Sequence, residues 1–510
     1  MLKLLQKNNT QKSKNFLFRT GLIFAVTFFI FFVLPTNHAE AAVNTFTGAT
    51  NSNWGTATNW SQGTVPTASD GHVTTFDATS PNCTVDASNK VANALDFSSY
   101  TNTITMTFSI TITGNITLGA SMNVSGSGIL LENATAVAPT LTSNGFLWPN
   151  GLTFNGNTIT AYTLADDWNI GGAFVCTGYA VLNGFNLYIG GNLTFQGTGS
   201  YMLGTTNLIM NGTGTYTHAN TGQLRNNLTF NTAGTITISG VIRYNTGTMT
   251  YTAGTIVHST SYLQTAASTT LNLNGAGVFG TWQINGTTTI TLLSDMYCSR
   301  ALFGATTVNA NINGAYKVYV SGNLEQNASG TGAVLGTATI ELVGSGNITS
   351  LGAGSWRLPI IINTSGTYNI PGFFYIINGS LTYTSGTLDW TGSFFQVNGT
   401  MTLDLQGQTI NDFNVGATSV ISLISGFNIA GAFTTTATAV ATTISSSVPG
   451  TQRIVTLLQG ATQNISMINA TDIDSSLGQT IRTYRGVLSN TTNWTTTSGG
   501  LQTVAYTFVF

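Results

Sequence analysis

Charged side chains are scarce in this sequence. They make up 6% of its 510 residues, against about a quarter in an ordinary soluble domain. Thr, Ser, Asn and Gly take their place, and because such a surface repels neighbouring molecules only weakly, proteins of this kind tend to associate. Beyond residue 41 there remain 9 basic residues (14 minus 5) and 15 acidic ones (16 minus 1), without a basic cluster. This composition lacks the electrostatic footprint of a nucleic-acid-binding protein and favours an anchored or assembled one.

Cysteine is equally sparse, and the common catalytic motifs are missing. Three cysteines, far apart and without CxxC spacing, give neither a disulfide framework nor a zinc site: Cys83, Cys176 and Cys298. We expect buried free thiols, with one bridging pair as the alternative. No histidine has metal-ligand spacing, and the serine motifs of hydrolases and the Gly-rich phosphate loops are absent. The sequence therefore predicts no catalytic residue, no metal ligand and no cofactor.

The first 41 residues have the layout of a secretory signal peptide. A basic head precedes an uncharged, mostly apolar run over residues 21–34, and Ala39, Glu40 and Ala41 offer a small-x-small cleavage site. The run is short for a membrane span, which needs about 20 residues, and a retained anchor is the alternative. We therefore predict a signal peptide over residues 1–41, a secreted or cell-surface protein, and no transmembrane span in the mature chain.

From about residue 100 to 435 the sequence has the texture of short strands. Segments such as NLYIGGNLTF (186–195) and TTLNLNG (269–275) alternate apolar residues with polar ones, so one face can be buried and the other wetted. Gly, Asn, Thr and Ser interrupt them often, as turns require. No sustained 3.6-residue pattern occurs beyond residue 41. The sequence predicts an all-β protein.

A long internal repeat organises this region. Residues 222–256 align without a gap on residues 354–388, with 14 identities in 35 positions at an offset of 132. All five glycines of the first copy meet glycines of the second. Such agreement is well above what composition alone would give, and it indicates a repeat architecture.

The repeat unit predicts a stack of coils. If three short strands and their turns take about 22 residues, a unit of about 130 residues holds about six coils. No Pro-rich or charged linker separates the copies, so we predict a right-handed parallel β-helix; tandem β-sandwiches are the alternative. The expected plan is a signal peptide (1–41), an N-terminal cap (42–100), the solenoid (101–435) and a C-terminal β cap (436–510).

The N-terminal module has a texture of its own. It contains NW at Trp54, then NWSxGxVPxxxD from Asn59 and VTxFDATS from Val73. This order resembles the opening of secreted bacterial surface proteins with a β-solenoid body, of the adhesin and autotransporter-passenger kind. The resemblance implies a secreted β-repeat protein. We expect Trp54 and Trp60 to be buried in a cap that closes the stack; stacking of the two rings on sugars is the alternative.

Few polar residues are candidates for chemistry. Asp166 and Asp167 form the tightest carboxylate pair, but neighbouring residues of a strand point to opposite faces. Asp167 has a repeat counterpart in Asp295, and we interpret both as turn caps rather than catalysts. Arg225 and Arg357 are also equivalent; we expect them to bind turn carbonyls, with an anionic sugar as the alternative ligand.

Two further sites are weaker candidates. In the C-terminal part, Asp472 and Asp474 form a DxD pair, which we expect to pair with arginines across turns; calcium would need a denser acidic loop. His258 aligns with Trp390 in the other copy, which suggests a tolerant surface or groove position.

Three functions compete at this stage. The first is an exported structural or adhesive β-solenoid that presents a neutral, hydroxyl-rich surface to glycans, cells or its own copies through many weak contacts. The second is a polysaccharide lyase or glycoside hydrolase on the same scaffold, which would need several charged side chains to converge. The third is binding to ice or another crystal surface through Thr-x-Thr ladders, which do not recur regularly enough. We expect no enzyme activity.

Overall fold

The computed structural model describes residues 42–497, except for ten short internal segments: 134–137, 156–159, 197–200, 220–221, 259–260, 287, 305–308, 328–331, 351–353 and 437–440. The predicted signal peptide (1–41) and the end of the predicted C-terminal cap (498–510) lie outside the described residues. The described residues from Asn44 to Thr497 belong to one compact unit.

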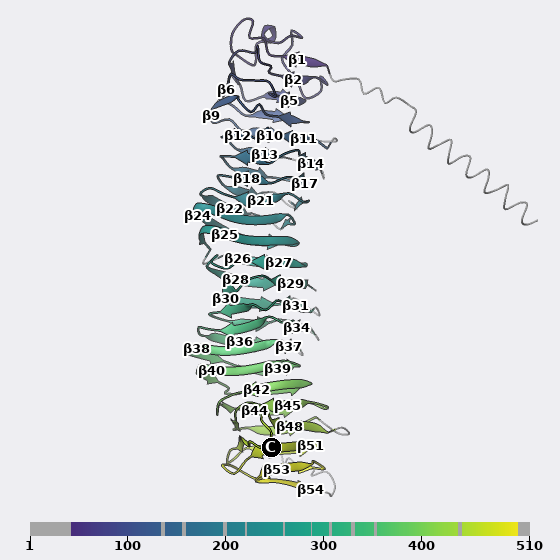
Figure 1. Cartoon of the computed structure of the whole chain (residues 1–510), viewed down its shortest axis with the longest axis vertical. Coiled ribbons are helices and arrows are strands. Elements are labelled where there is room, and N and C mark those ends of the chain that lie inside the picture. The colour runs from purple at the N-terminus through teal and green to yellow at the C-terminus, as the bar shows by residue number, and fades with distance from the viewer. Residues whose placement is uncertain are drawn as a thin grey trace, which may run out of the picture. The chain divides into compact units, whose positions relative to one another are not determined.

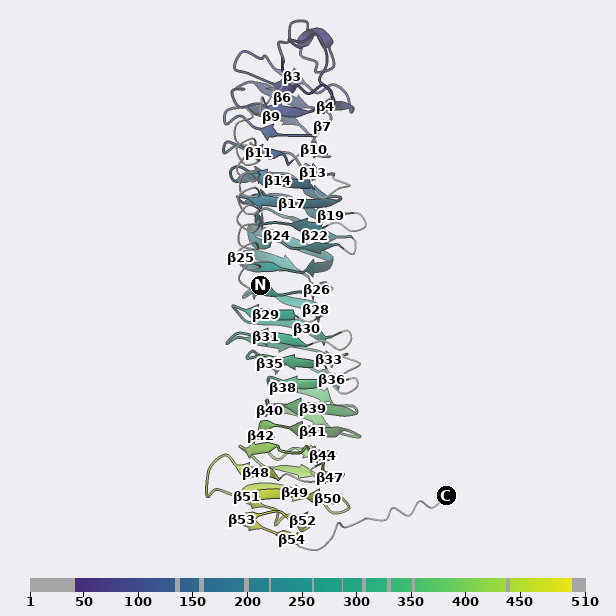
Figure 2. The ribbon, with the colours of Figure 1, turned by 90° about the vertical axis from the view of Figure 1, so that its right-hand side faces the viewer.

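This unit is a parallel β-solenoid of about 18 turns with almost no helix. Its strands follow one another along one axis (Figures 1 and 2). Through much of the first half, each strand pairs in parallel with the third strand after it, so that a coil has three strands. Leu130, for example, pairs with Leu152, and Leu152 pairs in turn with Phe174. The predicted parallel β-helix is confirmed. The tandem β-sandwich alternative is wrong, because the stacking continues through both copies of the repeat.

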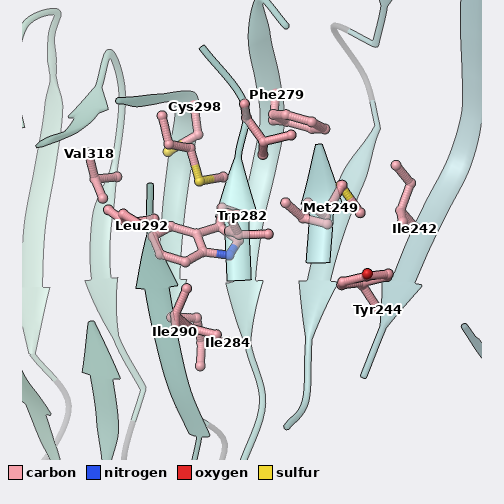
Figure 3. Packing of buried hydrophobic residues seen from close by; sticks show 14 of the residues in the cluster. Ile242, Tyr244, Met249, Phe279, Trp282, Ile284, Ile290, Leu292, Cys298 and Val318 are labelled. Atoms are coloured by element: carbon pink, nitrogen blue, oxygen red, sulfur yellow. The ribbon is translucent and has the colours of Figure 1, made fainter. Parts of the chain in front are cut away.

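The alternation in the sequence builds a continuous apolar core. In β18 (Leu187–Ile189) the outer two side chains are buried and Tyr188 between them faces outward. Parallel pairing without a shift then places Trp168, Leu187 and Leu208 in one inward column. Figure 3 shows such packing around the indole of Trp282. Each fully buried side chain of this kind contributes about 1.5–3 kcal/mol, so the core is held by many similar contributions and has no single centre.

The internal repeat is a structural repeat as well. The pairing of β24 (Asn227–Tyr244) with β25 (Gly247–Val257) shifts register around Asn231. That of β38 (Pro359–Asn369) with β40 (Ser380–Asp389) shifts around Asn363, the equivalent residue of the second copy. Both copies also contain a tyrosine that closes its own turn: Tyr251 donates to the carbonyl of Gly254 and Tyr383 to that of Gly386, each at 2.7 Å. The two copies therefore share the bend of the coil as well as its sequence.

The N-terminal end of the stack is covered by an aromatic cluster. Trp54 and Trp60 pack at a centroid distance of 4.9 Å, and Trp54 also contacts Phe76. Both indoles are buried, and Trp60 Nε1 donates to the carbonyl of Trp54 at 2.8 Å. Their predicted burial is confirmed. The alternative of sugar stacking is wrong, because neither ring is displayed.

Coil corners are so tightly stacked that some accept only glycine. A Cβ atom on Gly344 would lie 1.8 Å from the carbonyl oxygen of Ser321, one coil earlier. Since that oxygen belongs to the backbone, a side chain here would force two coils apart. We expect Gly344→Ala to lower the free energy of unfolding by about 2 kcal/mol, measured by denaturant unfolding followed by circular dichroism. Ser321→Ala is the matched control, because it leaves the facing carbonyl in place. Equal stability of the two variants would show that the coils separate easily at this corner.

Candidate functional site

The two neighbouring aspartates serve different coils. Asp166 accepts hydrogen bonds from the backbone N–H groups of Ser143 and Asn144, in the preceding coil, at 2.7 and 2.6 Å. Asp167 accepts from the N–H of Asn186, in the following coil, at 3.0 Å. One carboxylate therefore binds the coil before it and the other binds the coil after it, so the two do not form a catalytic pair.

The counterpart Asp295 has the same role as Asp167. It accepts a hydrogen bond from the N–H of Lys317, one coil on, at 2.8 Å. Asparagines fill this role elsewhere: Asn192 accepts from the N–H of Thr215, and Asn227 from that of Thr248, at 2.8 and 2.9 Å. The interpretation of Asp167 and Asp295 as turn caps is confirmed. The abundance of Asn in the sequence follows from the same need, since each such side chain satisfies a backbone donor at a coil corner.

The two equivalent arginines lie on different faces of the solenoid. Arg225 is next to Leu224. The strand partners of Leu224 in the next six coils form one column, which ends at Ser350. Arg357 adjoins Trp356, which pairs with Val334 in another column. The solenoid therefore does not bring the two arginines together.

Each of these arginines contacts a side chain two positions earlier in its own coil. Arg225 Nη2 donates to Gln223 Oε1 at 3.1 Å, and Arg357 Nε donates to Ser355 Oγ at 3.3 Å. Both of these partners are side chains, whereas the sequence suggested turn carbonyls.

The other weak candidates are structural. Asp472 accepts from the N–H of Gly450 at 2.9 Å and from the amide of Asn490, while Asp474 accepts from the N–H of Ser476. The expected pairing of these aspartates with arginines is therefore wrong: loop backbone and an amide take that place.

The interpretation of the His258 and Trp390 position as a tolerant surface is also wrong, because both side chains are buried. His258 stacks on Phe279 at 4.1 Å and Trp390 packs against Phe374 and Phe395. The position accepts either residue because both are flat rings that can stack on a neighbour in the core.

The cysteines are buried free thiols, as predicted. Burial raises the pKa of Cys176 and of Cys298 to about 12, and that of Cys83 well above its usual value. Because only the thiolate is a nucleophile, these three residues do not carry reactive chemistry.

A set of long outward polar side chains lies on five strands in the middle of the stack. They are β24, β26 (Tyr262–Thr265), β28 (Val278–Ile284), β30 (Met296–Phe303) and β33 (Leu324–Gln326). We call the following residues the polar face: Arg243, Tyr262, Gln264, Gln283, Arg300 and Glu325. Strand register sets their order, because each lies on the wetted side of a strand whose other side faces the core.

Within the polar face, long side chains join coil to coil. Gln264 lies opposite Arg243 on one side and Gln283 on the other. The guanidinium of Arg243 donates to the amide oxygen of Gln264, whose nitrogen donates to Gln283 Oε1 at 3.3 Å. These residues thus form a hydrogen-bonded row parallel to the solenoid axis, with one side chain in each coil.

The same column leads through Leu302 to a partly exposed ion pair at Glu325. Arg300 Nε and Nη2 donate to the two carboxylate oxygens of Glu325 at 2.9 and 2.5 Å, and Asn323 donates to the same carboxylate at 3.1 Å. The hydrogen bond from Arg300 to Glu325 raises the pKa of Arg300, and Tyr262 adds to the effect. The charge of Arg300 is therefore compensated by Glu325, whereas Arg243 donates to the neutral amide of Gln264.

A second ion pair lies close along the chain. Lys317 Nζ donates to Glu341 Oε2 at 2.7 Å, and Asn363 Nδ2 donates to Glu341 Oε1 at 2.8 Å. Burial acts to raise the pKa of Glu341, but these hydrogen bonds outweigh it and hold the pKa below its usual value. Beside them the rings of Tyr297 and Tyr319 stack at 4.6 Å. Glu341 is accordingly an ionised structural carboxylate and not a proton donor.

This arrangement is suited to binding hydroxyl groups. Guanidinium, amide and carboxylate groups offer donors and acceptors in fixed planar geometry. In Arg243, Gln264 and Gln283 such groups recur at the spacing of hydrogen-bonded strands, about 4.8 Å, which is close to the length of one pyranose unit in an extended polysaccharide. Among the residues that the structure describes, no three His, Cys, Asp or Glu side chains are placed to hold a metal ion.

The sequence interpretation missed the polar face. Its signal was present as long polar residues one coil apart, such as Arg243, Gln264 and Gln283. Recognising them requires knowing where each coil begins.

Comparison with protein-family models, curated proteins and solved structures gave no match for this chain. Within the described part of the chain, no helix has the length and apolar character needed to cross a membrane.

Proposed function

We propose that this protein is an exported structural and adhesive solenoid that binds neutral polysaccharide along the polar face. The observation that carries the proposal is the row of Arg243, Gln264 and Gln283, which places one planar hydrogen-bonding group in each of three successive coils. Three successive sugars of a polysaccharide lying along the axis would each meet a planar hydrogen-bonding group.

Repetition supports the adhesive part of the proposal. Each contact between an amide and a sugar hydroxyl is weak, because both groups give up water to form it. Several such contacts on one rigid stack act together, since the coils are already ordered and little conformational entropy is lost on binding. Export is proposed from the predicted signal peptide and from the resemblance of the N-terminal module to secreted surface proteins.

We propose binding rather than catalysis on the chemistry of the carboxylates. A glycosidase needs an acid whose pKa is raised, set apart from a second carboxylate. Glu325 is engaged by Arg300, and Glu341 by Lys317 with a lowered pKa. This engagement supports a scaffold whose ionic groups maintain its shape.

The test is co-sedimentation of the full-length mature protein with insoluble polysaccharides such as cellulose, chitin and xylan. We expect retention on at least one of them and at least tenfold weaker retention for the double variant Gln264→Ala/Gln283→Ala. The matched control is Gln396→Ala, an outward glutamine in β41 (Phe394–Asn398), outside the five strands of the polar face.

Three results would overturn the proposal. The first is equal retention of the wild type and the double variant, and the second is no retention on any polysaccharide. The third is release of reducing or unsaturated ends into the supernatant, which would identify an enzyme. Circular dichroism of each variant shows whether the fold is retained.

A further inference from the structure

A second candidate site lies near the C-terminal end of the stack, where the coil lengthens. Thr409 pairs with Asn428, but the adjacent Phe427 pairs with Val455, which lies much further along the chain. The added residues lie between β46 (Phe427–Ile429) and β49 (Arg453–Leu457). Longer and shorter coils cannot cover each other fully, and a hollow of ≈ 390 Å³ opens beside these strands. We call it the arginine hollow; its lining includes Phe427, Asn428, Arg453, Ile454, Thr456 and Leu477.

Two polar groups in the arginine hollow lack partners. Arg453 Nε is buried and makes no hydrogen bond, and none of the ion pairs of the described residues includes this arginine. Thr456 is 3% exposed, and its hydroxyl has no hydrogen-bond partner either. Leaving a buried polar group unsatisfied costs about 1–3 kcal/mol. Both residues line the same space, so a single ligand could satisfy them together.

The rest of the lining is amphipathic. Leu477 is 71% exposed and Ile454 41% exposed, so both offer apolar surface at the hollow. Asn428 and Gln406 also line the hollow. The volume is within the range of small-molecule sites. The hollow thus combines one unpaired cation, neutral hydrogen-bonding groups and an apolar wall.

We propose that the arginine hollow binds a uronate-type sugar, with its carboxylate on Arg453. The guanidinium fork matches the two oxygens of a carboxylate. A pyranose ring has an apolar C–H face for Leu477 and Ile454, and its hydroxyl groups suit Thr456 and Asn428. The inference goes beyond the neutral-polysaccharide function and does not depend on the polar face, which lies in different coils.

The test is a calorimetric or NMR titration of the full-length mature protein with D-glucuronate, D-glucose and benzoate. We expect D-glucuronate to bind and D-glucose, which lacks the carboxylate, to bind at least tenfold more weakly. Benzoate, which lacks the hydroxyl groups, should also bind at least tenfold more weakly. Arg453→Gln should weaken D-glucuronate binding at least tenfold and Arg453→Lys less. Thr456→Val should weaken it a few-fold.

The controls separate this inference from the proposed function. Arg482→Gln removes an exposed arginine of β52 (Ile481–Tyr484) and should leave D-glucuronate binding unchanged. Gln264→Ala/Gln283→Ala should also leave it unchanged, even where retention on neutral polysaccharide is lost. No binding of D-glucuronate, equal binding of D-glucose, or tighter binding of benzoate would each overturn the inference. Circular dichroism confirms the fold of each variant.

Discussion

Replacing Trp54 by alanine is expected to open the N-terminal cap and to convert the protein into larger species. Trp54 is fully buried and packs against Trp60 and Phe76 at centroid distances of 4.9 and 5.5 Å. Truncating such a side chain costs about 3–5 kcal/mol. Because the cap is a small part of a long stack, this loss falls on the cap and not on the whole molecule.

The expected association follows from what the cap covers. The first coils of a parallel stack have strand edges with unpaired N–H and C=O groups, which template pairing with another chain. An additional low-temperature unfolding step in calorimetry and a shift to larger mass in light scattering would report the opening. Leu147→Ala is the control, since that side chain is 57% exposed. An unchanged melting profile and an unchanged mass would show that the aromatic cluster does not close the stack.

Acidification is expected to destabilise the protein through a buried histidine. His218 is 6% exposed, and the hydroxyl of Tyr216 lies 3.2 Å from its Nδ1. Burial, with a smaller effect of the Arg243 charge, lowers the pKa of His218 to about 4. In the unfolded chain the pKa is about 6.5. Below pH 6.5 the unfolded state binds a proton that the folded state does not bind until about pH 4. Stability is therefore full above pH 6.5 and falls by about 3 kcal/mol as the pH drops towards 4.

A comparison of variants isolates this contribution. Carboxylates also titrate in this range, so the measured quantity is the difference in unfolding free energy between pH 7.5 and pH 4.5 for wild type and His218→Phe. The variant should lose clearly less stability than the wild type over this interval. Burial also lowers the pKa of His258. Because His258 is present in both proteins, its contribution to the loss of stability is the same in both. The same loss in both proteins would mean that His218 is protonated in the folded state.

The architecture was largely predictable from the sequence, for a physical reason. Strand alternation fixes which side chains face inward, as in Leu187–Ile189, and a repeat without gaps requires coils of similar length. The turn-capping roles of Asp167 and Asp295 could be predicted from the sequence, because a short carboxylate side chain readily accepts hydrogen bonds from the backbone of a turn. These features are local, and local patterns survive in a stack where each coil contacts only its neighbours.

The candidate site was not predictable, because it depends on register between coils. The length of chain between strand partners varies along the stack: it is short between Phe394 and Asp412 and clearly longer between Ile116 and Leu141. A small error in the length of one coil moves Gln264 away from Gln283 entirely. The same limit explains the error at His258 and Trp390: alignment gave their equivalence but not the side of the strand on which they lie.

The parallel stacking of coils has a consequence for how this molecule can change length. The strands of each coil pair with those of the coil before and the coil after, so duplication of a stretch of about 22 residues would lengthen the stack by about 4.8 Å. The contacts at both ends would stay as they are. The number of outward side chains presented along one side could thus be increased without redesigning any part of the fold.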